Sequence, residues 1–134
     1  MDLETLNKHY DLVQKLKEAR ELYKTTEAKS LGAQSLDGMP HGTGVSDKVA
    51  VLAVALADIS GQVEFLEKQV AESAAPINVF ICGISDLRTR LIFRYRFLYG
   101  MSWGEVSGMF PGMAEATAKN VCYSYLIASN RNRA

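Results

Sequence analysis

Gly100-Met101-Ser102-Trp103-Gly104-Glu105-Val106-Ser107 is the stretch that decides the fold of the C-terminal third. Ser102 and Glu105 have the spacing of a capping box. In this motif the serine hydroxyl accepts from the third backbone N–H of a helix, and the glutamate accepts from the N–H of the cap residue. We therefore expect a short helix from Trp103 to about Met109. Gly100 ends the helix that precedes it.

A turn and a longer helix follow this short helix. Pro111 cannot continue a helical hydrogen-bond ladder, and Gly112 tolerates a positive φ. Apolar residues then step by three or four from about Met113 or Ala114 to Ala128, which predicts a last helix. Two helices joined by a short turn that contains glycine form a helix-turn-helix.

The helix before this pair is expected over 86–99, capped by Ser85 or Asp86. It is apolar on more than one side, as is typical of a helix packed between two partners. Residues 85–134 are therefore interpreted as one helix-turn-helix domain.

Residues 46–84 form the preceding segment, which begins with a heptad helix. Apolar residues recur there in alternating steps of three and four, giving a seam about 32 Å long at 1.5 Å per residue. A short connecting helix is expected to start near Pro76 and to end at Gly83. The seam residues are Val49, Leu52, Leu56, Ile59, Val63, Leu66 and Val70.

The N-terminal segment, 1–30, is expected to be one long helix, and 31–45 a Gly-rich linker. Two arrangements fit the seam. The first helix folds back and covers it as a hairpin, or the seam joins two copies of the chain as a homodimer. The predicted fold is all-α, with a long N-terminal helical hairpin or coiled coil followed by a helix-turn-helix bundle.

Charge is distributed unevenly along the 134 residues, although the net charge is zero. Residues 1–85 hold 8 Lys/Arg and 12 Asp/Glu, whereas 86–134 hold 7 Lys/Arg and 3 Asp/Glu. Such asymmetry indicates either that the C-terminal end meets a polyanion or that surface charge is scattered.

Several function classes are disfavoured by the residues that are missing. Cys82 and Cys122 lack CxxC spacing and are interpreted as small buried residues, and His9 and His41 have no acid or cysteine at ligand spacing. We expect no metal, no cofactor and no enzymatic activity. Met1 is followed by charged residues, and no apolar run approaches the length of about 20 residues that spans a membrane. A cytoplasmic protein without membrane contact is expected.

The stretch from Arg90 to Ser107 resembles the fourth region of bacterial sigma factors, and the resemblance extends over 86–128, about a third of the chain. In the family string, an arginine is followed six positions later by a second arginine and an aromatic residue. A glycine comes next, and then a serine, an aromatic residue, a glutamate, an aliphatic residue and a small residue. The positions that fit it are Arg90, Arg96, Phe97, Gly100, Ser102, Trp103, Glu105, Val106 and Ser107.

The whole layout resembles a group of small phage and prophage proteins of gram-positive bacteria. Their long N-terminal helix and Gly/Pro-containing link precede a sigma-like helix-turn-helix, as Gly38-Met39-Pro40 and Ser46-Asp47-Lys48-Val49 do here. The resemblance implies a regulator of phage late or packaging genes in a bacterial host cell. The chain departs from the family at 110–113, where Phe-Pro-Gly-Met replaces a Leu-Gly turn with a hydroxyl cap.

A recognition helix of this kind presents side chains to base edges in the major groove of double-stranded DNA, and cations beside it contact phosphates. The expected contacts with bases come from the first turns of the last helix. The alternative interpretation of these residues is a solvated face, with Trp103 and Tyr123 packed in the core. The candidate DNA-binding residues are Ser102, Trp103, Glu115, Thr117, Lys119, Asn120, Tyr123, Arg131, Arg133, Arg88 and Arg90.

Arg96 and Glu105 have a structural role in the resembling fold, where they face one another behind the first helix of the motif. The resemblance implies an ion pair between them that orients the helix-turn-helix.

Three functions fit the sequence. The first is a DNA-binding transcriptional regulator that also contacts RNA polymerase. The second is a protein that binds and inhibits or modulates another host protein through the same scaffold without DNA. The third is a DNA-packaging protein similar to a small terminase subunit, which also joins a helix-turn-helix to oligomerising helices.

Overall fold

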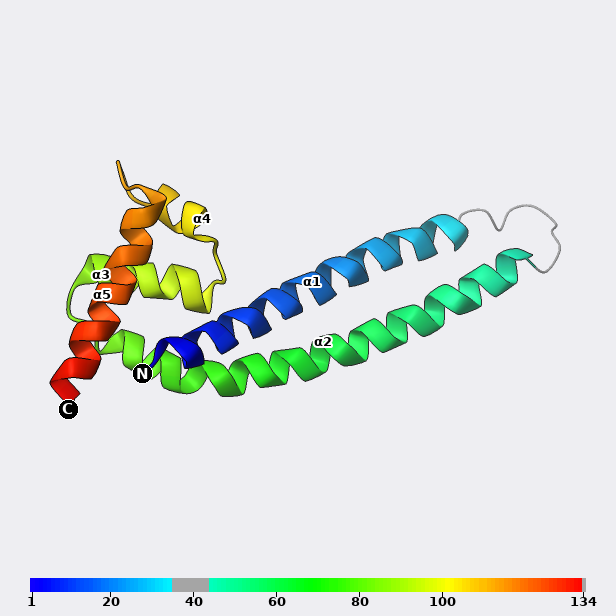
Figure 1. The fold of residues 1–134 in the computed structure, drawn as a ribbon. Coiled ribbons are helices and arrows are strands. Elements are labelled where there is room, and N and C mark those ends of the chain that lie inside the picture. The colour runs from blue at the N-terminus through cyan, green and yellow to red at the C-terminus, as the bar shows by residue number, and fades with distance from the viewer. Residues whose placement is uncertain (35–43, 134) are drawn as a thin grey trace. The chain divides into compact units, whose positions relative to one another are not determined.

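The computed structural model describes the backbone of residues 1–34 and 44–133, and the side chains of 1–32 and 47–132. Within these ranges every regular element is a helix (Figure 1). The predicted all-α fold is confirmed. The elements are α1 (Leu3–Gln34), α2 (Gly44–Cys82), α3 (Leu87–Phe93), the π-helical turn η1 (Arg94–Leu98), α4 (Trp103–Gly108) and α5 (Glu115–Arg133).

The chain divides into two compact units, and α1 and α2 contribute to each. Unit 2 comprises 15–68, where α1 and α2 lie side by side and antiparallel (Figure 1). Arg20 Nη2 lies 3.1 Å from Glu67 Oε1 across this pair. The predicted seam faces inward, since Leu66 is buried and the other seam residues are half-buried. The hairpin interpretation is therefore confirmed, and α1 of the same chain covers the seam.

The predicted boundaries need three corrections. Helix α1 continues to Gln34, and α2 begins at Gly44, so that the linker predicted over 31–45 is shorter; its positions 35–43 lie outside the described residues. No separate helix starts at Pro76, which lies inside α2. A proline in a helix costs about 3 kcal/mol. Ile77 and Ile81 are fully buried directly after it, and their packing offsets that cost.

One apolar stretch is longer than we expected from the sequence. Asp47–Cys82 contains an 18-residue window with mean hydropathy 1.7, and 6% of this window is buried. By length and composition alone, this helix could cross a membrane. The expectation that no run approaches this length was wrong because alanines between the seam residues keep the hydropathy high. Helix α2 also carries Asp58, Glu64 and Glu67, which a lipid-spanning helix disfavours.

Unit 1 comprises 1–14 and 69–134, and it has a dense core. Side chains from α1, α2, α3, η1, α4 and α5 all enter it, with Phe93 and Phe97 the largest fully buried ones. Phe93 makes edge contacts with Phe80 and Tyr125 at ring distances of 5.6 Å. The core residues are Leu6, Ile77, Ile81, Ile84, Ile92, Phe93, Phe97, Val106, Ala118, Cys122 and Leu126.

The helix expected over 86–99 is present, but its second half is π-helical. The side chain of Asp86 caps α3 by accepting from Thr89 N at 3.0 Å and from Thr89 Oγ1 at 2.7 Å. In η1 the ladder widens, and Tyr99 N donates to Arg94 O at 3.1 Å. Gly100 ends the turn at φ 68°. Together these features set the direction in which α4 starts.

Candidate nucleic-acid interface

The predicted capping box is confirmed at the start of α4. Glu105 N donates to Ser102 Oγ at 3.1 Å, and Ser102 N donates to Glu105 Oε1 at 3.1 Å. The turn after α4 ends at Gly112, whose φ of 68° requires glycine in practice. Helices α4 and α5 therefore form the two helices of the expected helix-turn-helix, although α5 starts one residue later than the latest position predicted and continues to Arg133.

Helix α5 has a buried face and an exposed face. Ala118, Cys122 and Leu126 are buried in the core of unit 1. On the opposite side, exposed residues recur in steps of three and four, which places them on one face of the helix. We call this set the outer stripe: Thr117, Asn120, Ser124, Ile127 and Arg131.

An open hollow of about 540 Å³ lies beside the outer stripe, between α5 and the start of α3. Its polar groups are hydroxyls and one amide, without a charged side chain. Ser124 and Thr89 were not among the predicted site residues. Ser124 continues the spacing of Thr117 and Asn120, a signal present in the sequence, whereas Thr89 depends on how α3 packs. The lining residues are Thr89, Thr117, Asn120, Val121, Ser124 and Tyr125.

Some predicted recognition residues lie on the flank of α5 nearer to α4 instead. Lys119 Nζ lies 5.6 Å from the ring centroid of Tyr123, and this ring meets Trp103 edge-on at 6.3 Å. Tyr123 and Trp103 are half-buried, so each packs against the core and remains partly exposed. The predicted set thus divides between the outer stripe and this aromatic flank.

The start of α4 is poorly suited to bind a phosphate of DNA. The capping carboxylate of Glu105 already accepts from Ser102 N. Glu115 also lies close, since a β-carbon at Gly104 would be 3.8 Å from its Oε2. Two carboxylates beside the amino end of α4 repel a third anion. Ser102 and Trp103, which were predicted to bind DNA, are therefore disfavoured as a phosphate site, and Glu115 is turned toward α4 rather than along the outer stripe.

The predicted cations differ in their freedom. Arg88 and Arg131 are exposed, whereas Arg90 is half-buried and its Nη1 donates to Ile84 O at 2.9 Å. Arg90 is thus held to the loop before α3. The side chain of Arg133 lies outside the described residues.

Arg96 is held by rings. Its guanidinium carbon lies 3.7 Å from the ring centroid of Tyr10 and 4.5 Å from that of Trp103. Arg96 Nη1 donates to Met101 O at 3.1 Å, and Nε is buried without a hydrogen-bond partner in the described part of the chain. The ion pair with Glu105 stays a prediction, but a structural rather than a DNA-contacting role agrees with these contacts.

Buried titratable groups in unit 1 are structural. Burial raises the pKa of the Cys122 thiol to about 12, so the thiol stays protonated. His9 is 1% exposed, and its Nδ1 lies 2.9 Å from Ser73 Oγ. Cys82, expected to be buried, is exposed because it lies on the outer side of the last turn of α2. Within the described residues no three His, Cys, Asp or Glu side chains group as a metal site.

Comparisons with protein-family models, with curated proteins and with solved structures found no match to this chain. The resemblance to the fourth region of sigma factors and to small phage regulators therefore remains a prediction from the sequence.

Proposed function

We propose that this chain is a DNA-binding transcriptional regulator of the phage type, and that α5 enters the major groove with its outer stripe. The observation that carries the proposal is the exposed polar set at the first turns of α5, behind a capped α4. Asn120 is the residue suited to bidentate pairing with adenine, and Thr117 and Ser124 supply hydroxyls for either base type. The resemblance supplies the class of regulator.

Phosphate contacts come from cations at the edges of the outer stripe. Arg88 precedes it on α3, Lys119 flanks it, and Arg131 ends it. Unit 1 as a whole holds 8 Lys/Arg and 7 Asp/Glu, a net charge of +1. Long-range attraction to DNA is therefore weak, and specific contacts must supply much of the affinity.

The test is fluorescence anisotropy with a labelled random-sequence duplex at 50 and 200 mM salt. Three phosphate contacts give a log–log slope of about −2.7, which corresponds to roughly 40-fold weaker binding over this range. Replacing Arg88, Lys119 and Arg131 by alanine should remove most of this dependence.

A matched control removes the same charge elsewhere. Lys24, Lys48 and Lys68 lie in unit 2. Their replacement by alanine should change the affinity for DNA by no more than about twofold, because it alters only the net charge of the protein and removes no phosphate contact. If wild-type protein fails to bind at 50 mM salt, or if both triple variants weaken binding equally, the proposed surface is wrong.

A second candidate is binding to another protein, with RNA polymerase as the first choice. It is favoured by a hollow of about 250 Å³ between the start of α1 and the end of α5, with Ile127 62% exposed at its edge. Apolar side chains in a hollow with a polar rim are typical of a docking site. The lining residues are Leu3, Tyr123, Leu126, Ile127 and Asn130.

Purified bacterial RNA polymerase is the probe for this candidate. Leu3→Asp should abolish co-sedimentation with the polymerase while leaving anisotropy with DNA within about threefold, because Leu3 lines the hollow from α1 and is not part of the outer stripe. Equal co-sedimentation of the wild type and the variant would contradict it.

A further inference from the structure

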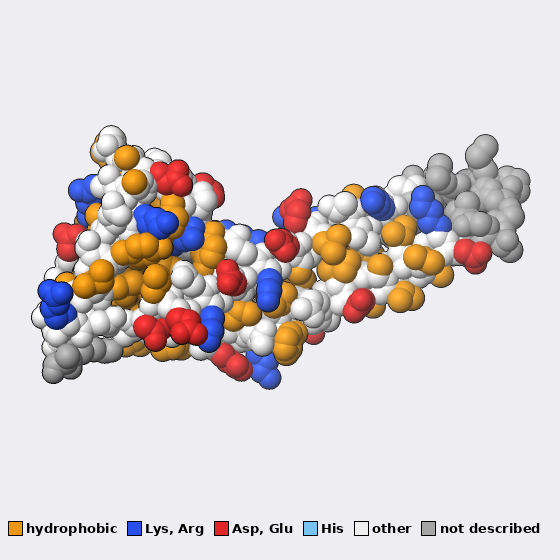
Figure 2. All heavy atoms as spheres, viewed as in Figure 1, with side chains coloured by type: hydrophobic (Ala, Val, Ile, Leu, Met, Phe, Trp, Pro, Cys, Tyr) orange, Lys and Arg blue, Asp and Glu red, His pale blue; other side chains and the backbone are white. Residues whose placement is uncertain are grey.

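Unit 2 is a pair of helices with little interior. Among its residues with described side chains, the buried ones are Leu16, Thr26, Ser30 and Leu66, and two of these are polar. Two helices alone bury only one stripe each, so the remaining apolar residues of α2 face outward. Figure 2 shows hydrophobic side chains at the surface of this unit between the charged ones.

Four large apolar side chains lie on one exposed face of unit 2. Leu22 and Phe65 are each 54% exposed, Val51 66% and Val54 71%. At 100° per residue, Leu22 is on the opposite side of α1 from Lys24, and Phe65 is on the opposite side of α2 from Glu67.

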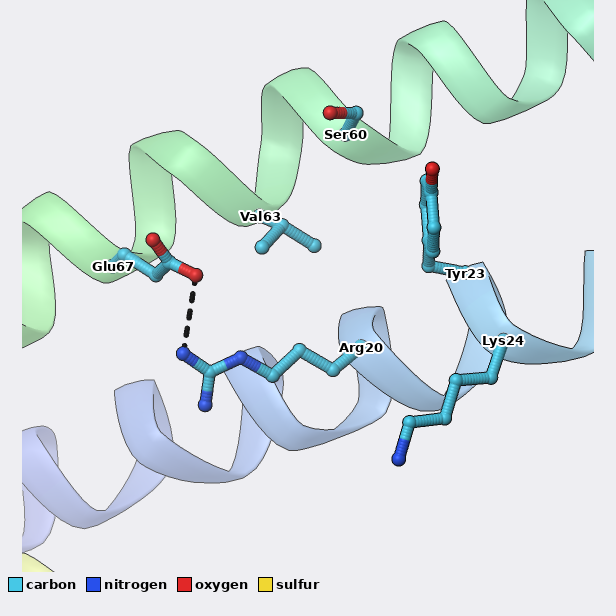
Figure 3. Close-up of a pocket in the computed structure, with 6 residues that line it drawn as sticks. All are labelled: Arg20, Tyr23, Lys24, Ser60, Val63 and Glu67. Atoms are coloured by element: carbon cyan, nitrogen blue, oxygen red, sulfur yellow. Dashed lines mark hydrogen bonds and ion pairs between the residues drawn. The ribbon is translucent and has the colours of Figure 1, made fainter. Parts of the chain in front are cut away.

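Lys24 and Glu67 both line the hollow of Figure 3, together with Arg20, Tyr23, Ser60 and Val63. Leu22 and Phe65 therefore lie on the side of the hairpin away from this hollow, and Val51 and Val54 lie within about 40° of Phe65 on α2. We call this side the apolar face.

Charged residues on the apolar face follow the same spacing. Lys15 and Lys29 are seven positions before and after Leu22, and Asp58 is seven positions before Phe65. The face thus presents Lys15, Lys29 and Glu18 on α1, since Glu18 is four positions before Leu22, and Asp58 and Asp47 on α2. The ion pair between Arg20 and Glu67 places these two residues at the same height along the antiparallel helices. Because both helices rise by the same distance per residue, Leu22 lies at the height of Phe65, and Lys29 lies at the height of Asp58.

We propose that the apolar face binds a second copy of this chain, forming an antiparallel four-helix bundle with its twofold axis parallel to the helices. In this arrangement α1 of one copy lies on α2 of the other at the same level. Leu22 meets Phe65 of the other copy, and Lys29 meets Asp58 of the other copy. A twofold axis perpendicular to the helices would instead place α1 of one copy on α1 of the other. The lysines of the two copies would then meet, and repulsion between like charges disfavours this arrangement.

The size of the face agrees with a stable dimer. Residues 47–68 of α2 extend roughly 33 Å, and two helices about 10 Å wide give roughly 650 Å² per copy. Stable interfaces bury about 600–1,000 Å² per partner, so this area is at the lower end of the range. A lipid surface fits less well, because Lys15, Lys29 and Asp58 would enter hydrocarbon without partners. The inference does not depend on DNA binding.

Sedimentation velocity on the full chain from 1 to 100 µM tests the proposal, which predicts a species of twice the 14.8 kDa chain mass. Val54→Lys should weaken dimerisation at least tenfold. Val79→Lys is the matched control, since Val79 is 76% exposed on α2 within unit 1, and it should leave the dimer intact. Circular dichroism checks that both variants keep the wild-type helix content.

A charge exchange separates contacts between copies from contacts within one copy. Lys29→Asp and Asp58→Lys should each be at least tenfold weaker dimers alone, and their equimolar mixture should form a heterodimer of wild-type affinity. No dimer for the wild type, no recovery on mixing, or an assembly larger than a dimer would overturn the proposal. It would also be overturned if a monomeric wild type floats with vesicles of phosphatidylethanolamine and phosphatidylglycerol while Val54→Lys does not.

Discussion

Arg96 stacks its guanidinium on the ring of Tyr10 at 3.7 Å, which ties the π-helical turn before the helix-turn-helix to the first helix of the chain. Trp103 lies on the guanidinium as well, at 4.5 Å, and thereby connects α4 to the same contact. The orientation of the helix-turn-helix thus depends on residues from both ends of the sequence within unit 1.

Arg96→Ala should lower the free energy of unfolding by about 2–4 kcal/mol. It removes two cation–π contacts, each about 0.5–2 kcal/mol, and a charged hydrogen bond to Met101 O. Arg96→Lys keeps the charge but not the planar stack, so it should recover less than half of the loss. Urea unfolding followed by circular dichroism measures both variants. An unchanged midpoint for Arg96→Ala would show that the stack contributes nothing.

The stability of unit 1 should fall in weak acid because of His9. Burial lowers the pKa of His9 from its ordinary 6.5, so the unfolded chain binds a proton more readily than the folded one. The stability contribution is complete above pH 6.5 and is lost as pH falls from there toward the folded-state pKa, with a slope of at most about 1.4 kcal/mol per pH unit.

The control for this prediction is His9→Asn, because asparagine can keep a hydrogen bond to Ser73 and does not titrate near pH 6. The pKa values of Asp2 and Asp86 are lowered by their hydrogen bonds to Thr5 and Thr89. These carboxyl groups therefore change the stability only below pH 3.8, outside the range of this experiment. Thermal unfolding from pH 7 to 5 should therefore show a slope for the wild type only. The same slope in both proteins would exclude His9 as its source.

Removing the cap of α4 should loosen the helix-turn-helix. Ser102→Ala should destabilise the protein by about 1 kcal/mol, the usual value of a capping serine. Ser102→Asp should retain part of the cap. Hydrogen exchange at the amide of Glu105 is the local measurement, because this N–H donates to Ser102 Oγ. Equal exchange rates in the wild type and Ser102→Ala would contradict the cap.

Pro76→Ala should stabilise the protein by about 1–3 kcal/mol. Pro76 is exposed inside α2, lacks a backbone N–H and interrupts the ladder, whereas alanine restores one hydrogen bond. An increase in thermal midpoint is the expected result. If the midpoint falls, a bend at Pro76 is required for the packing of Ile77 and Ile81.

Local signals in the sequence predicted local structure well. The capping box at Ser102 and Glu105 and the positive-φ glycines at 100 and 112 lie where the sequence places them, because each depends on residues a few positions apart. The continuity of α2 through Pro76 was missed because local propensity opposes it and burial of Ile77 and Ile81 overrides it. Propensity is a weak guide where tertiary packing decides.

The candidate site was predicted only in part for the same reason. Spacing identified Thr117 and Asn120, which lie on the outer stripe. The orientation of Glu115 toward Gly104 and the tether of Arg90 to Ile84 O involve neighbouring elements, and periodicity within one helix carries no information about them. Tyr10 beside Arg96 is likewise a contact between distant segments.

Chemical-shift mapping is the most direct test that α5 reads DNA. The isotope-labelled full chain is titrated with a short random-sequence duplex, and backbone amide shifts are followed. The account predicts the largest shifts at Thr117, Asn120, Ser124 and Arg131, with smaller ones at Arg88. Shifts confined to Leu3 and its neighbours at the start of α1, or no shifts at millimolar DNA and low salt, would contradict it.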